Sequence, residues 1–335
     1  MTSMDRRTLV VGVCTTVLVP MSTRAQTAER VYRVGLLTPA ATALIDSLIA
    51  ALRERGWMVG RNLVVEIRYT QGDPERAETL ARDLVQERVD LIVTNVTATA
   101  MAARRATSVI PIVMLTSGFP VEGGLAKSLA RPGGNVTGMT LYAGGLLFGK
   151  FVQLLRELVP SLRELGVLWS YAPPSYRPEQ VAPATDELRR AARALNVKLR
   201  FWQTGTEGDL GSALTAAANA PLDALFVTSG LIHALPEIRA RIARFALQRR
   251  LPALTDFPGG FFAEGAVLAY SVNVKELTDR TASFVDRILK GAKPGELPIE
   301  QPTKYELSVN LKTAKALGLN IPHSLLIRAD RVIDQ

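Results

Sequence analysis

Cysteine and histidine are nearly absent from this chain. Its 335 residues include one cysteine, Cys14, and two histidines, His233 and His323. A single cysteine cannot form an intramolecular disulfide and excludes a cysteine-rich metal or cluster site. His323 has no acidic neighbour in the sequence, so the two histidines do not suggest a metal site. We expect no metal ligands.

Enzyme motifs are also missing. No dinucleotide fingerprint, Walker A loop, Gly-x-Ser-x-Gly elbow or His-Glu-x-x-His motif occurs. We therefore expect no catalytic residues and no cofactor. One alternative stays open, because Ser229, His233 and Asp256 could form a Ser-His-Asp arrangement. Nothing in the sequence indicates the strained nucleophile turn or the oriented base that such a triad needs, so a loop histidine without a catalytic role is favoured.

Long runs of like charge are absent as well. The chain has 40 basic and 31 acidic residues, a net charge of +9, but the basic residues occur mostly as pairs such as Arg104-Arg105 and Arg249-Arg250. Arms that bind nucleic acids usually carry longer basic runs. Solvated helix faces explain these pairs better, and we expect no nucleic-acid partner.

The apolar run near the N-terminus is short. Residues 8–19 follow Asp5-Arg6-Arg7 and precede Pro20 and small polar residues. A helix needs about 20 apolar residues to span a bilayer, so this pattern predicts a secretory signal peptide over residues 1–25. We expect cleavage after Ala25 or, as the second choice, after Ala28. The paired arginines permit twin-arginine export, although the residues around them match that signal weakly.

From residue 31 onward, short β-rich runs alternate with amphipathic segments, as in parallel α/β proteins. A first set has predicted strands at 32–38, 63–70, 90–95, 110–116 and 136–140, with helices at 42–55, 74–88 and 97–107. After a helix at 145–158, a second set has strands at 164–170, 198–204, 224–229, 252–256 and 266–271, with helices at 179–195, 207–219, 235–250 and 275–290. The length allows two domains. We predict an N-terminal α/β lobe over 26–142, a C-terminal α/β lobe over 143–296, and a segment at about 297–335, with a helix at 311–317, that returns to the first lobe.

Small polar and aromatic side chains follow the predicted strands. Loops at the carboxyl ends of parallel strands line the ligand crevice of such folds. Hydroxyl and amide groups near helix N-termini suit an anionic group such as a carboxylate, while aromatic side chains can cover an apolar part. Each residue could equally be an ordinary helix cap. The candidates are Thr38, Thr94, Asn95, Thr97, Thr116, Ser117 and Gly118 in the first lobe and Ser170, Tyr171, Ser229, Asp256 and Phe257 in the second.

Four stretches resemble the ABC-transporter substrate-binding proteins of the group that includes the TrpX-like binders. They are ATSVIPIV at 106–113, GGLAKSLARPGGNVTG at 123–138, LLRELVP at 154–160, and the tail from ILKGAKP at 288–294 to NLKTAKALGL at 310–319. The resemblance covers about residues 32–333. It implies the type I periplasmic binding protein fold: two Rossmann-like lobes with parallel sheets joined by a hinge, and three crossovers. It also implies a periplasmic monomer that captures a small-molecule solute for an ABC permease in the inner membrane.

Departures from the family pattern bear on the ligand. Relatives often have Gly-Asp-Pro-Val where this chain has Gly118-Phe119-Pro120-Val121, and Tyr171 adds a ring to the turn after residue 170. These changes favour a more apolar or aromatic ligand. Together with the hydroxyl and amide groups at the strand ends, they predict a small carboxylate-bearing ligand that is aromatic or apolar and amino-acid-like. Tyr270 matches a family tyrosine and could face the cleft or be a buried strand residue. A periplasmic sensor feeding a receptor kinase and, less favoured, an enzyme on the same scaffold remain alternatives.

Overall fold

The computed structural model describes residues 30–142, 147–171, 176–257 and 259–334. The described residues from 31 onward belong to one compact unit. The predicted signal peptide, Cys14 and both predicted cleavage positions lie outside the described residues. In the described part of the chain, no helix is both long and apolar enough to cross a membrane.

The first lobe is built on a parallel five-stranded sheet with the strand order β2-β1-β3-β4-β5. Most of its strands are apolar and buried, as expected for a parallel sheet covered on both faces, whereas the edge strand β2 is only partly buried. They are β1 (Tyr32–Thr38), β2 (Leu63–Tyr69), β3 (Leu91–Thr94), β4 (Ile112–Met114) and β5 (Val136–Gly138).

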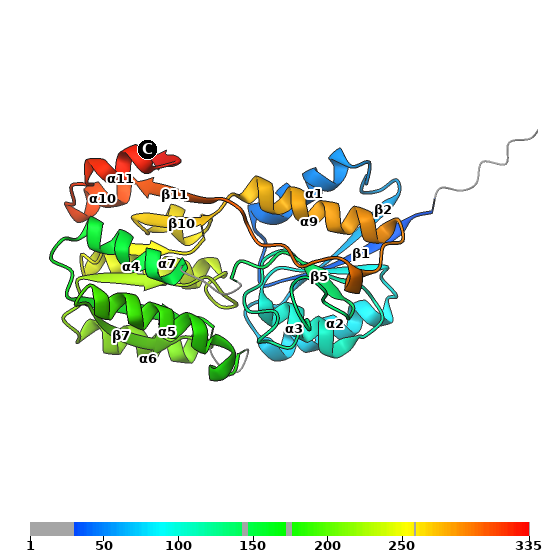
Figure 1. The fold of residues 1–335 in the computed structure, drawn as a ribbon, viewed down its shortest axis with the longest axis horizontal. Coiled ribbons are helices and arrows are strands. Elements are labelled where there is room, and N and C mark those ends of the chain that lie inside the picture. Colours follow the sequence, from blue (N-terminus) through cyan, green and yellow to red (C-terminus); the bar gives the residue numbers. More distant parts are fainter. Residues whose placement is uncertain (1–29, 143–146, 172–175, 258, 335) are drawn as a thin grey trace, which may run out of the picture. The chain divides into compact units, whose positions relative to one another are not determined.

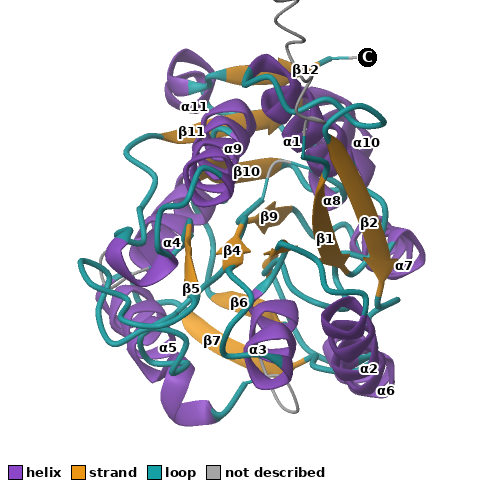
Figure 2. Cartoon of the chain, turned by 90° about the vertical axis from the view of Figure 1, so that its right-hand side faces the viewer, coloured by secondary structure: helices purple, strands orange, loops and turns teal. Residues whose placement is uncertain are grey.

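Alternate residues of β1 point to opposite faces of this sheet and meet different helices. Val34 and Leu36 pack toward α1 (Ala43–Glu54) and α9 (Val274–Leu289), whereas Leu37 packs toward α2 (Pro74–Gln86) and α3 (Thr97–Ala106). Figure 2 shows the strands between these two pairs of helices. The Asp73-Pro74 pair starts α2 as the sequence predicts, because the Asp73 side chain accepts hydrogen bonds from the amides of Glu75 and Arg76.

The second lobe is built on a seven-stranded sheet with the strand order β12-β11-β10-β9-β8-β6-β7. Figure 1 shows β10 and β11 toward one side of this lobe and β7 toward the other. All neighbouring strands are parallel except β10 and β11, which are antiparallel. The strands are β6 (Glu164–Trp169), β7 (Lys198–Gln203), β8 (Ala224–Val227), β9 (Ala253–Thr255), β10 (Leu268–Val272), β11 (Tyr305–Asn310) and β12 (Arg331–Ile333).

Helices cover both faces of the second sheet. Val167 and Trp169 of β6 pack toward α4 (Leu147–Leu158) and α5 (Pro178–Ala194). Leu168 points the other way, toward the second group of helices. That group comprises α6 (Glu207–Ala218), α7 (Pro236–Gln248) and α8 (Phe261–Glu264), and the remaining helices are η1 (Pro294–Glu296), α10 (Leu311–Leu317) and α11 (His323–Arg328).

Two α/β lobes are therefore present, as predicted, but the lobe boundaries differ from the prediction. Helix α9 falls within the predicted second lobe, 143–296, yet its apolar face packs against α1 and the first sheet. Residues of the predicted return segment do reach the first lobe, where Glu300 pairs with Met139. The rest of that segment was wrongly assigned, because β11 pairs with β10 and β12 with β11 in the second sheet. The chain thus passes between the lobes after β5, after β10 and before β11.

Candidate ligand-binding site

A cavity of about 510 Å³ lies where loops from the two sheets meet. Its first-lobe wall comes from the loops after β1, β3 and β4, and its second-lobe wall from the loops after β8 and β9. Its volume falls in the usual range for small-molecule sites, about 300–1,000 Å³. Among the candidate residues from the sequence, the cavity brings together Asn95, Thr116, Ser229 and Phe257.

Asn95 connects the ends of three strands of the first sheet. Its Nδ2 donates to Thr38 Oγ1 at 3.2 Å, and Thr116 Oγ1 donates to its Oδ1 at 3.0 Å. Thr38 in turn donates to the Ala40 carbonyl. All three side chains are buried, so these bonds hold the amide in one orientation beside the cavity. Asn95 can use its second amide hydrogen for a ligand.

The N-terminus of α1 also borders the cavity. Thr42 is the N-cap of this helix, but its side chain makes no capping bond, and its buried Oγ1 has no hydrogen-bond partner among the described residues. Ala41, Thr42 and Ala43 line the cavity. Free amide groups and the positive end of the helix dipole favour an anion at such a position. Thr38 was the only candidate from the sequence after the first strand, and Thr42 was not included. The position of Thr42, directly before an amphipathic helix, was the signal that could have identified it as a candidate.

Asp256 is the centre of a buried polar cluster next to this cavity. Its Oδ2 accepts from the Tyr142 hydroxyl at 2.6 Å and the Tyr171 hydroxyl at 3.2 Å, and its Oδ1 accepts from the Ser229 amide at 2.6 Å. The Tyr171 and Ser229 hydroxyl oxygens lie 2.9 Å apart. Tyr142 was not a candidate from the sequence.

Burial and charge keep both tyrosines of the cluster protonated. Burial raises the pKa of the Asp256 carboxyl, although the hydrogen bonds from Tyr142, Ser229 and Tyr171 favour its charged form. Burial first, and then the nearby Asp256 charge, raise the pKa of Tyr142 and that of Tyr171 well above the ordinary value. Both phenols therefore stay hydrogen-bond donors at neutral pH.

Several other candidates lie at the strand ends without lining this cavity. Thr97 Oγ1 accepts from the Gly118 amide at 2.7 Å and donates to the Gly118 carbonyl at 3.1 Å, so it ties the ends of β3 and β4 together. Thr94, Ser117 and Ser170 are buried, and their hydroxyls have no hydrogen-bond partner within the described ranges. Ligand contact by these residues stays a prediction.

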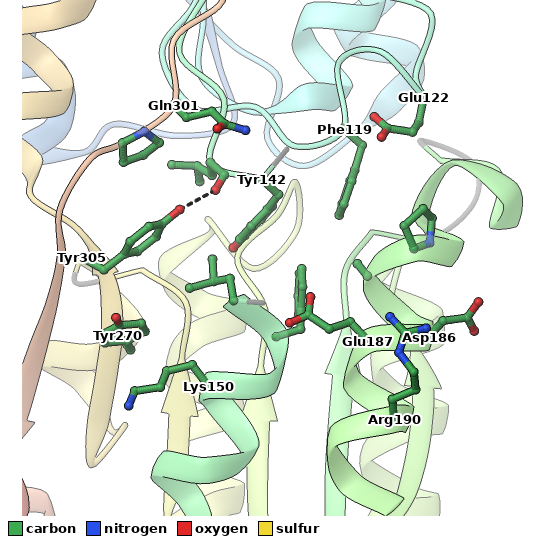
Figure 3. A pocket seen from close by; sticks show the side chains of 16 residues that line it. Phe119, Glu122, Tyr142, Lys150, Asp186, Glu187, Arg190, Tyr270, Gln301 and Tyr305 are labelled. Atoms are coloured by element: carbon green, nitrogen blue, oxygen red, sulfur yellow. Dashed lines mark hydrogen bonds between the residues drawn. The ribbon is translucent and has the colours of Figure 1, made fainter. Parts of the chain in front are cut away.

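Tyr270 lies in a different place. It borders a second cavity, of about 840 Å³, together with Tyr142, Tyr305 and the first turn of α4 (Figure 3). The rings of Tyr270 and Tyr305 stack with centroids 5.7 Å apart, and the Tyr305 hydroxyl donates to the Leu141 carbonyl. Glu187, also on this cavity, accepts from the Gly149 amide near the start of α4. Tyr270 is thus separated from Asn95 and Thr116, and the Tyr142 side chain reaches from the second cavity to Asp256.

The Ser-His-Asp alternative is not assembled in the structure. His233 Nδ1 lies 2.6 Å from the Thr228 carbonyl, so it carries the proton and donates, and Nε2 accepts from Thr204 Oγ1 at 3.1 Å. Neither ring nitrogen contacts Ser229, and Asp256 bonds the tyrosines instead. Among the described residues, no group of three His, Cys, Asp or Glu side chains could hold a metal ion.

Burial of His233 predicts a loss of stability in mild acid. Burial lowers its pKa to about 4, whereas an unfolded histidine titrates near 6.5. Between these values the unfolded chain binds a proton that the folded chain excludes, so the free energy of unfolding rises with pH through this window. We expect His233 to account for about 2 kcal/mol of the stability lost between pH 7.5 and pH 5.

Urea unfolding at these two pH values would measure this contribution. His233→Gln should reduce the difference in free energy of unfolding between them by about that amount, whereas His323→Gln, at an exposed position of α11, should leave it unchanged. An unaltered pH dependence in His233→Gln would contradict the assignment.

Comparisons with known proteins agree with this architecture. A family model described as ABC transporter substrate binding protein matches residues 34–333. A tyrosine-binding protein of Clostridioides difficile is 27% identical over 272 residues, which are 81% of this chain and 75% of that protein.

Two solved structures are similar over the same range. A conserved domain protein from Vibrio cholerae has a TM-score of 0.81 and 26% identity, covering 90% of this chain and 100% of that chain. The ABC domain from Streptococcus pneumonia, solved in complex with L-Trp, has a TM-score of 0.80, 23% identity and the same coverage. The family match takes in both lobes and every strand end that borders the 510 Å³ cavity. This chain therefore belongs to the family of ABC transporter substrate-binding proteins.

Proposed function

We propose that this protein is the periplasmic solute receptor of an ABC importer, and that it binds a small carboxylate-bearing, aromatic or apolar amino-acid-like ligand in the 510 Å³ cavity. The signal peptide predicted over residues 1–25 would direct its export, and lobe closure would present the loaded form to an inner-membrane permease. The observation that carries the ligand class is that the N-terminus of α1 lines this cavity together with Asn95, while the Thr42 hydroxyl has no hydrogen-bond partner among the described residues.

The first-lobe wall supports a carboxylate at this end of the ligand. The α1 amides and the Asn95 amide are neutral donors that are already held in place, by the helix and by hydrogen bonds to Thr38 and Thr116. Donors fixed before binding lose little entropy when an anion arrives. Exclusion of water from the cavity would strengthen the hydrogen bonds further.

The second-lobe wall supports an apolar or aromatic remainder. Val227, Ile242, Phe257 and Phe261 line this side of the cavity. The Ser229 hydroxyl offers a polar contact for an ammonium group. Ser229 is tied to Asp256 in two ways, because its amide donates to that carboxylate and its hydroxyl contacts Tyr171, which also bonds Asp256. The 27% identical relative is a tyrosine-binding protein. Tyrosine combines a carboxylate, an ammonium group and a ring, which are the three groups that we propose for the ligand of this chain.

Thermal unfolding against a solute panel tests this proposal. The panel contains L-tyrosine, L-tryptophan, L-leucine, the matching amines without a carboxylate, a nucleobase and a sugar. The protein is first unfolded and refolded to remove any co-purified solute. A ligand present at 100 times its Kd adds about 2.7 kcal/mol of stability, which appears as a rise in Tm. We expect a rise with an amino acid and none with its amine. No rise with any carboxylate would refute the proposed ligand class.

Asn95→Ala should weaken binding of the solute found by this panel by about 10- to 100-fold. The substitution removes the amide donor and leaves Thr116 without its acceptor, and hydrogen bonds to charged groups are worth about 1.5–3 kcal/mol. Titration calorimetry would measure the Kd. Asn135→Ala is the matched control, since Asn135 is equally buried but bonds the carbonyls of Thr107 and Ile110. The control should lose stability and keep its affinity; unchanged affinity in Asn95→Ala would remove Asn95 from the site.

A further inference from the structure

The Asp256 cluster joins the two lobes at the Tyr142 hydroxyl, which donates to Asp256 and lies 3.4 Å from the Tyr171 hydroxyl. Tyr142 belongs to the first lobe, because its carbonyl accepts from the Phe119 amide and its backbone forms a bridge with Gly118. Asp256 follows β9 of the second lobe. The 2.6 Å bond from the Tyr142 hydroxyl to Asp256 Oδ2 is short, buried and made to a carboxylate. Bonds of this kind are among the stronger ones in proteins.

Aromatic rings from both lobes pack around this bond. Phe119, also of the first lobe, stacks on Tyr142 with centroids 5.7 Å apart and meets the edge of Tyr171 of the second lobe at 6.1 Å. Tyr142 and Tyr171 meet edge to face at 5.9 Å. Phe119 has a φ of +56°, a left-handed conformation that is rare for a bulky residue. Such strain persists only where the surrounding contacts outweigh it.

We propose that Phe119 and Tyr142 of one lobe and Tyr171 and Asp256 of the other form an interlobe latch, which holds the lobes together when no ligand is bound. The latch stands between the two cavities, because Tyr142 lines one of them and bonds the carboxylate beside the other. It shifts the ligand-free protein toward the closed state, so that less of the binding energy of a solute is spent on closure. The inference concerns the ligand-free protein and does not depend on which solute it binds.

Distances between two spin labels test the latch directly. Cys14 is the only cysteine, so a chain with Cys14→Ser can be labelled at two introduced cysteines alone. Val109→Cys, before β4, and Leu247→Cys, near the end of α7, place one label on each lobe at positions that are 82% and 49% exposed. Pulsed electron paramagnetic resonance on the refolded, ligand-free protein should give one narrow distance distribution for the otherwise unchanged chain.

Tyr142→Phe removes the hydroxyl but keeps the ring that stacks on Phe119. We expect a second, longer distance to appear, with the ratio of closed to open molecules reduced about tenfold or more. Phe119→Gly, which removes the ring and tolerates the positive φ, should give the same change. Near-ultraviolet circular dichroism would verify that both variants are folded.

Tyr270→Phe is the matched control. It removes a phenol hydroxyl that borders the same 840 Å³ cavity as Tyr142, but its ring stacks on Tyr305 within the second lobe, so the distance distribution should not change. The latch would be refuted by a mainly long distance in the unsubstituted protein, by an unchanged distribution in Tyr142→Phe, or by equal lengthening in Tyr270→Phe. A solute panel without any hit would count against the proposed function and leave these distances unaffected.

Discussion

Replacing Gly138 by alanine is expected to destabilise the protein by about 4 kcal/mol or more. Gly138 ends β5 with a φ of +121°, which an alanine rarely adopts. An added Cβ would lie 2.3 Å from the carbonyl oxygen and 2.5 Å from the amide nitrogen of Met114. Both atoms belong to the backbone of β4, so no side-chain rotation can relieve the contact.

The same glycine anchors a segment that passes between the lobes. Its carbonyl accepts from the Glu300 amide at 2.9 Å, and the neighbouring Met139 amide donates to Met114. Thermal unfolding should show a Tm lowered by about 10 °C or more. Gly134→Ala is the control, because a Cβ at Gly134 would meet nothing within 4 Å, and its Tm should stay within about 2 °C of the original. Equal Tm values for the two variants would contradict the close approach of β4 and β5.

Asp256→Ala is expected to cost about 3 kcal/mol of stability and to abolish the hydrogen bond between Tyr142 and Asp256 that joins the lobes. It would leave the Tyr142 hydroxyl, the Tyr171 hydroxyl and the Ser229 amide without their acceptor in a buried region. Unsatisfied buried donors cost about 1–3 kcal/mol each, and the cavities on either side can supply water to some of them.

Urea unfolding would measure the loss in Asp256→Ala, with Asp186→Ala as the comparison. The Asp186 side chain is 56% exposed and forms an ion pair with Arg189 on the surface of the same helix, so its removal should change the free energy of unfolding by less than about 0.5 kcal/mol. A second readout is the titration of tyrosine absorbance. Loss of the Asp256 charge should lower the pKa of Tyr142 and that of Tyr171, because that charge raises both. Full stability in Asp256→Ala would show that the cluster is not structural.

Local sequence patterns predicted the elements of this fold well. The apolar run of β3 and the Asp73-Pro74 start of α2 both lie where expected, because each depends on burial or capping within a few residues. The loops after the strands also predicted Asn95, Thr116, Ser229 and Phe257 at one cavity. Parallel strands place their carboxyl ends at one edge of a sheet, so this grouping follows from topology alone.

Features that depend on distant partners were not predictable in this way. The periodicity of α9 indicates an amphipathic helix, but an apolar stripe does not say which sheet it will cover. Tyr142 and Asp256 are 114 positions apart, and no local signal connects them. Helix α8, helix α11 and strand β12 were missed because they are only a few residues long, too short for a period to be visible.

The packing of α9 on α1 also affects how this chain must fold during synthesis. The Trp57 indole nitrogen donates to Asp286 Oδ1 at 2.9 Å, a contact that joins residues 229 positions apart. Until α9 has been translated, the apolar side chains Leu48 and Leu52 of α1 lack the helix that covers them. Contacts of such long range slow folding. The nascent first lobe therefore stays incomplete until α9 has left the ribosome, which happens only near the end of synthesis.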